Sequence, residues 1–211
     1  MKTVYLLLTR SSTIFSYMIR MLTGAAYTHV SVSVDNPQEI PAGSGLYSFG
    51  RKHPLLWFPA GFVRENREGG YFRLFPRTAC VLLALDVPDE AFHEISVRLR
   101  KMEICQHIYR YNLIGALLCG LGIRFERRRR YFCSQFVGDL LLRSHAADLP
   151  KSAALMQPAD YTDLPGVRQV YTGTVGELLG YPDIHRFPFT KMPGILAILS
   201  KLCYTEARPN K

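Results

Sequence analysis

The segment THVSVSVD, residues 28–35, constrains the fold more than any other stretch of this chain. Valines at 30, 32 and 34 alternate with His29 and two serines, and this period of two is the pattern of a β-strand. One face of the strand is apolar and suited to a core, whereas the other carries an imidazole and hydroxyls. We therefore predict a sheet strand with a buried valine face and a polar face that begins at His29.

Apolar runs and helical spacings elsewhere predict the partners of this strand. Further strands are expected at 3–8, 46–50, 61–66, 71–75 and 80–88, with a loop and then a short strand in 154–173. Helices are expected at 11–24, 89–108, 133–143 and 194–202, and residues 112–122 form either a buried helix or a connector. Strands dominate the first half and helices flank them, which favours an α+β fold over a doubly wound sheet.

Composition bounds the function classes. A chain of 211 residues that is 48% hydrophobic suits one domain, placed here at 1–180, followed by a tail at 181–211. The net charge of +9 suits an anionic membrane surface, nucleic acid or acidic polymers, or simply a basic solvated exterior. Five cysteines without a CxxC pair or zinc-ligand spacing predict reduced thiols, no metal and a cytoplasmic location. The chain shows no signal-peptide pattern, no membrane-spanning run and no nucleotide-binding glycine motif, so no cofactor is expected.

The segment RRYFCSQFVGDLLL, residues 129–142, carries the main chemical hypothesis. Cys133 opens a helix whose apolar stripe it shares, and a helix N-terminus favours a thiolate because free N–H groups point at it. Arginines 127–130 add positive charge nearby. The alternative is that Cys133 is a small buried space filler, as free cysteines often are. The other four cysteines lack this setting and are interpreted as structural: Cys80, Cys105, Cys119 and Cys203.

A cysteine nucleophile also requires a general base within reach. Of six histidines, five lie in polar or loop-like stretches, whereas His29 lies on the predicted strand. A structural role is the alternative for His29. A cysteine at a helix tip beside a histidine on a strand is a recurrent nucleophile–base arrangement. The sequence therefore predicts a pair formed by Cys133 and His29.

The order of three segments, YTHVSVSVD, LYSFGRK and YFCSQFVGDLL, resembles the circularly permuted papain-like hydrolases of the NlpC-type superfamily. The resemblance spans roughly residues 3–175. It implies an α+β fold with a small antiparallel sheet packed against the Cys-bearing helix, with Cys133 as nucleophile and His29 as base. Members of the superfamily are thiol hydrolases or acyltransferases, many acting on cell-wall peptides and others on lipid esters or amides.

The resemblance also implies a polar group, on the strand after the histidine strand, that orients the imidazole. The matching residue is Ser48, although a hydroxyl cannot stabilise an imidazolium as a carboxylate would. Glu65 is a rival, and Asp35 is a third choice that also suits a solvated turn. The backbone N–H of Cys133 would be the first oxyanion donor. The second would come from Tyr111 or Tyr131, unless these tyrosines only pack.

Three functions follow from these features. The first is a cysteine hydrolase that cleaves an amide or ester through an acyl-enzyme. The second is a lipid acyltransferase or phospholipase-like enzyme at a membrane surface, suggested by the basic run 127–130 and the apolar segment 194–202. The third is a catalytically inactive basic binding module. Nucleic acid is not an expected partner, because no reading helix, RNP-like strand or zinc module is present. The sequence does not specify the substrate or the oligomeric state.

Overall fold

The computed structural model describes residues 1–10, 26–39, 45–53, 59–65 and 71–181. The helices expected at 11–24 and 194–202 lie outside these residues, as does the expected tail beyond residue 181.

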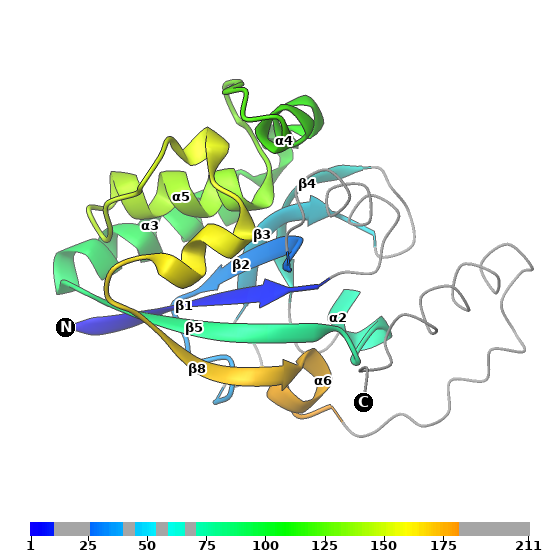
Figure 1. The fold of residues 1–211 in the computed structure, drawn as a ribbon, viewed down its shortest axis with the longest axis vertical. Coiled ribbons are helices and arrows are strands. Elements are labelled where there is room, and N and C mark those ends of the chain that lie inside the picture. The colour runs from blue at the N-terminus through cyan, green and yellow to red at the C-terminus, as the bar shows by residue number, and fades with distance from the viewer. Residues whose placement is uncertain (11–25, 40–44, 54–58, 66–70, 182–211) are drawn as a thin grey trace, which may run out of the picture.

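Eight strands form one mixed sheet in the order β7-β6-β4-β3-β2-β1-β5-β8 (Figure 1). Every neighbouring pair is antiparallel except β6 and β7, which run parallel. The strands are β1 Lys2–Thr9, β2 His29–Ser33, β3 Leu46–Arg51, β4 Ala60–Glu65, β5 Ala79–Val87, β6 Arg110–Tyr111, β7 Arg130–Tyr131 and β8 Val167–Thr174. The α+β class is confirmed, but the sheet is larger than the small antiparallel sheet that the resemblance implied.

Helices lie on both faces of the sheet. They are α2 Tyr71–Leu74, α3 Asp89–Ile104, α4 Leu113–Gly120, α5 Cys133–Arg143 and α6 Val175–Leu178, with 3₁₀ turns at Gln106–Ile108, Ala153–Leu155 and Pro158–Asp163. α3 and α5 pack together on one face, whereas α6 packs beside β8 and α2 on the other (Figure 1). Within the described residues, no helix has the length and apolar character needed to cross a bilayer.

One predicted strand is wrong. Residues 71–75 begin with α2, and the amide of Phe75 bonds to the carbonyl of Tyr71 at 3.0 Å. The two rings then lie 4.7 Å apart, because residues four apart share one side of a helix. Residues four apart, such as Tyr71 and Phe75, share one side of a strand as well as one side of a helix, which explains the error.

The alternation along β2 places its two kinds of side chain on opposite faces. Val30 and Val32 belong to the core beneath α5, together with Phe136 and Val137 of that helix. By alternation, His29, Ser31 and Ser33 point to the other face. The central strand β1 is buried on both faces, which explains its continuous apolar run.

An aromatic cluster fastens α5 to the sheet. Phe49 of β3 lies 5.7 Å from Phe62 of β4 and 5.2 Å from Phe136 of α5, measured between ring centroids. Tyr109 and Tyr131 pack against Phe49 at 6.3 and 5.2 Å. Since Phe49 touches all four other rings and has no exposed surface, it is the centre of the cluster.

The ladder between β2 and β3 is short. Its register contains a single partner pair among the described residues, Val32 with Tyr47, and the next residues, Ser31 and Ser48, are not paired in the ladder. The Ser48 hydroxyl instead donates to the Val30 carbonyl at 2.6 Å. The regular ladder therefore ends before Val30, the residue after His29, and a side-chain hydrogen bond joins the two strands there.

Replacing Phe49 with alanine should destabilise the protein strongly, because a fully buried ring would leave a cavity beneath α5. The expected loss in the free energy of unfolding is about 3–5 kcal/mol. Phe92→Ala on α3 is the matched control, since Phe92 is only partly buried and should cost clearly less. Urea unfolding measured by circular dichroism provides both values, and equal losses for the two variants would contradict the central role of Phe49.

Candidate active site around Cys133

Cys133 is the first residue of α5, as predicted, and its side chain is buried against β2. The residue is 6% exposed. Burial raises the pKa of its thiol above the ordinary value. Hydrogen bonding from the backbones of Val30, Ser134 and Cys133 itself, and from the Ser134 side chain, acts in the opposite direction and lowers that pKa. The helix N-terminus thus favours the thiolate as expected, but desolvation is the larger effect.

His29 is the first residue of β2, and its ring leans toward β3. A Cβ atom added to Gly50 would lie 3.7 Å from Cε1 of the ring. Nε2 lies 3.4 Å from the hydroxyl oxygen of Ser31, two residues along the same face. Burial, and then the positive charge of Arg51, lowers the pKa of His29 to about 4. The imidazole is therefore neutral at neutral pH, the form that a general base requires.

Cys133 and His29 approach the same point from opposite faces of the sheet. The sulfur interacts with the backbone of Val30, the residue that follows His29. Although both residues are described, no hydrogen bond joins their side chains, so the expected pair is not a preformed ion pair. The two residues thus flank Val30, where the β2–β3 ladder gives way to the bond between the Ser48 hydroxyl and the Val30 carbonyl.

Two predicted orienting residues do not contact the His29 ring. Ser48 is buried, but its hydroxyl donates to the Val30 carbonyl, and no contact between Ser48 and the imidazole is present in the described structure. Asp35 lies beyond the opposite end of β2, where its amide bonds to the Ser33 hydroxyl at 3.1 Å. Ser31, which the sequence placed on the histidine face but did not single out, is the hydroxyl nearest to the ring.

Glu65, the rival candidate, is a buried carboxyl on the same face of the sheet. Its register partner Leu46 belongs to the core on the face opposite α5. Burial raises the pKa of Glu65 to about 7, and the charge of Arg51 opposes this effect. Its Oε2 atom is buried and finds no hydrogen-bond partner among the described residues. Glu65 and His29 therefore share one neighbouring cation, Arg51, although they do not touch each other.

The two tyrosines proposed as oxyanion donors differ in their surroundings. Tyr111 interacts electrostatically with Cys133, and burial holds its pKa well above the ordinary value, so its hydroxyl keeps its proton. Tyr131 hydrogen-bonds to Asp139 and packs on Phe49 and Phe136. Tyr111 is thus the better placed of the two, and Tyr131 belongs to the packing of α5.

Other polar groups near Cys133 were not predicted. Tyr161 is fully buried, and its hydroxyl donates to the Ser134 carbonyl in the first turn of α5 at 2.5 Å. Gln135 is polar, but it is 4% exposed and its side-chain oxygen accepts a long bond of 3.4 Å from the Asn112 amide. Helical spacing could have indicated neither contact, because each partner comes from another segment of the chain.

The described residues contain no cluster of three His, Cys, Asp or Glu side chains arranged to hold a metal ion. The sequence matches no protein-family model, and a search of curated proteins finds no match to it.

The pKa changes of Glu65 and His29 predict two pH dependences of the free energy of unfolding that oppose each other. Folding holds the Glu65 pKa near 7 instead of 4.5, so its contribution falls as pH rises through this window. Folding holds the His29 pKa near 4 instead of 6.5, so its contribution rises with pH. The two effects largely cancel in the native chain between pH 4.5 and 6.5.

Single variants should separate them. In Glu65→Gln only the His29 effect remains, so the free energy of unfolding should rise with pH across this window. In His29→Gln only the Glu65 effect remains, so the free energy of unfolding should fall. Each change should be at most roughly 3 kcal/mol, since one pKa unit corresponds to about 1.4 kcal/mol. Urea unfolding at a series of pH values measures both slopes, and parallel slopes in the two variants would contradict the assigned pKa directions.

Proposed function

We propose that this protein is a cysteine-dependent acyl hydrolase that cleaves an amide or ester bond through an acyl-enzyme on Cys133. The observation that carries the proposal is the position of Cys133: its sulfur receives backbone hydrogen bonds at the first turn of α5 and lies against the residue next to His29. A space-filling cysteine does not require a set of N–H groups around its sulfur.

The chemistry follows from these groups. His29 accepts the thiol proton, and the sulfur attacks the carbonyl carbon of the substrate to form a tetrahedral intermediate. The backbone N–H of Cys133 and the Tyr111 hydroxyl are the donors nearest to the resulting oxyanion. The leaving amine or alcohol then takes the proton from His29, and water, activated by the same imidazole, releases the acyl group and restores the thiol.

The resting state favours neutral partners over an ion pair. The thiol pKa is raised and the imidazole pKa is lowered, so both groups are uncharged at neutral pH. Proton transfer would therefore accompany attack on the bound substrate, and catalytic hydrogen bonds are often long before substrate binds. Glu65 and Arg51 lie on the histidine side of the sheet, and the charge of Arg51 opposes a second positive charge on the ring.

The test is acylation by an activated ester. Incubation with p-nitrophenyl acetate should add one acetyl group to Cys133, detected by mass spectrometry of the intact chain and its peptides, and should release p-nitrophenol. Cys133→Ala should abolish this acylation, and His29→Gln should slow it about a hundredfold to ten-thousandfold, the usual contribution of a general base.

Cys119→Ala is the matched control. Cys119 is also buried, and burial raises its thiol pKa to about 11, but it lies on α4 and bonds to the Met156 carbonyl. Its removal should leave acylation of Cys133 unchanged. Equal labelling of the native chain and the Cys133→Ala variant, or a normal rate in folded His29→Gln, would rule the proposal out.

A further inference from the structure

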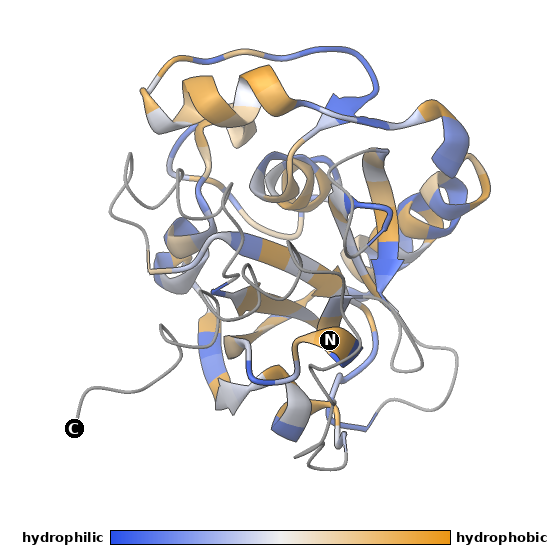
Figure 2. Cartoon of the chain, turned by 90° about the vertical axis from the view of Figure 1, so that its right-hand side faces the viewer, coloured by the Kyte–Doolittle hydropathy of each residue, from blue (hydrophilic) through white to orange (hydrophobic). Residues whose placement is uncertain are grey.

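An apolar and basic surface surrounds α4 and the loop that follows it. Ile114, Leu121 and Ile123 are 50%, 62% and 51% exposed. Arginines 124, 127, 128 and 129 are exposed in the adjoining loop. Figure 2 shows α4 at the top of the molecule as a hydrophobic helix, with the hydrophilic loop beside it. We call these seven residues the α4 surface.

The outer face of α4 lacks the polar residues that a solvated helix normally carries. Its eight residues, LIGALLCG, contain no charged or hydroxyl side chain. Gly115 and Cys119 are buried, and the Cys119 thiol bonds to the Met156 carbonyl at 3.7 Å. Ile114 and Leu121, seven positions apart, remain on the outer side. A helix that is apolar all round normally has an apolar environment on every side.

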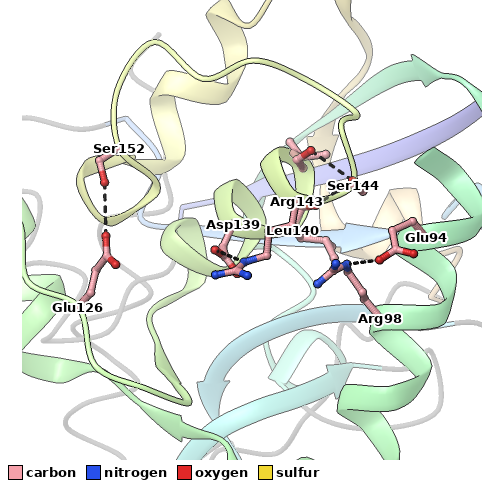
Figure 3. Close-up of polar contacts among 9 residues, drawn as sticks. Glu94, Arg98, Glu126, Asp139, Leu140, Arg143, Ser144 and Ser152 are labelled. Atoms are coloured by element: carbon pink, nitrogen blue, oxygen red, sulfur yellow. Dashed lines mark hydrogen bonds and ion pairs between the residues drawn. The ribbon is translucent and has the colours of Figure 1, made fainter. Parts of the chain in front are cut away.

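The arginines beside this face are largely uncompensated. Arg124 pairs with Glu126 at 2.9 Å, and Glu126 also accepts from Ser152 at 3.5 Å (Figure 3). For Arg127, Arg128 and Arg129 the described part of the chain provides no ion pair. The aliphatic side chains and these unpaired cations are adjacent, so one flat partner could contact both.

We propose that the α4 surface docks on an anionic lipid bilayer, with Ile114, Leu121 and Ile123 entering the acyl–headgroup boundary and the arginines contacting lipid phosphates and carboxylates. Apolar side chains beside basic ones are the combination that binds interfaces, and each cation near an anionic surface contributes to binding. A second copy of the chain is a poorer occupant, because the arginine loops would repel each other. Nucleic acid is poorer too, because aliphatic side chains do not stack on bases.

The surface is held rigidly beside Cys133. Asn112 caps α4 by accepting from the Gly115 amide at 3.2 Å, and its side-chain amide donates to the Phe125 carbonyl at 3.2 Å. Its own backbone amide bonds to the Tyr131 carbonyl at 2.9 Å, two residues before Cys133. Docking through α4 would therefore bring the N-terminal end of α5 close to the bilayer, although the docking itself does not depend on the proposed catalysis.

The experiment is co-sedimentation of the full chain with two kinds of vesicle. One contains phosphatidylcholine alone, and the other contains about a third phosphatidylserine. We expect binding to the anionic vesicles only, weakening steeply as salt is raised because the charges are screened. Replacing Arg127 or Arg128 with serine should lower the partition coefficient about fivefold, equivalent to about 1 kcal/mol. The double variant Ile114→Ser/Leu121→Ser should weaken binding at least tenfold and leave the protein folded.

Matched controls lie elsewhere on the surface. Val97 on α3 is 47% exposed, and the Arg168 side chain on β8, at the opposite edge of the sheet, is 56% exposed. Val97→Ser and Arg168→Ser should bind vesicles as the native chain does. Equal losses in the controls, or no binding to anionic vesicles at low salt, would overturn the proposal. So would a dimer in sedimentation velocity that Leu121→Ser dissociates, or binding to single-stranded RNA in place of vesicles.

Discussion

The end of the β2–β3 ladder before Val30 is the constraint on which the candidate site depends. A regular ladder would have closed this part of the sheet and kept the two faces apart. The ladder instead ends at Val32 and Tyr47, the Ser48 hydroxyl satisfies the Val30 carbonyl, and the Cys133 sulfur interacts with the Val30 backbone. The thiol on one face and the imidazole on the other thereby flank the same irregular point of the sheet, at Val30.

Burial dominates the electrostatics on both sides of the sheet at this point. It raises the pKa of the Cys133 thiol and lowers that of His29, so it favours the neutral form of each group. The same effect raises the pKa of Glu65, and the Arg51 charge lowers the pKa of both Glu65 and His29. The site therefore holds few fixed charges besides Arg51, and a reaction there would create charge in surroundings prepared with N–H groups and hydroxyls.

The sequence predicted those features that depend on local spacing. The alternation at 28–35 identified β2 and its two faces, and the apolar stripe after Cys133 identified α5 with the cysteine at its first residue. It could not predict features that depend on how distant segments pair. Ser48 was assigned to the imidazole because strand order was inferred, but its bond depends on where the β2–β3 ladder ends. Gln135 is buried because Asn112, from another helix, meets it.

The start of α5 places free backbone N–H groups at the Cys133 sulfur. Most helices satisfy their first N–H groups with a Ser, Thr, Asp or Asn cap, and the loss of such a cap costs about 1 kcal/mol. The N-cap position here is Phe132, which provides no side-chain hydrogen bond. The first-turn N–H groups are therefore left to the Cys133 sulfur, or to an anion that forms beside it. α3 also begins without a side-chain cap, at Pro88, so a missing cap alone does not distinguish a nucleophile from a space filler. What distinguishes α5 is that its first residue is a buried cysteine, so that under the proposed function the same N–H groups would face the thiolate and the oxyanion.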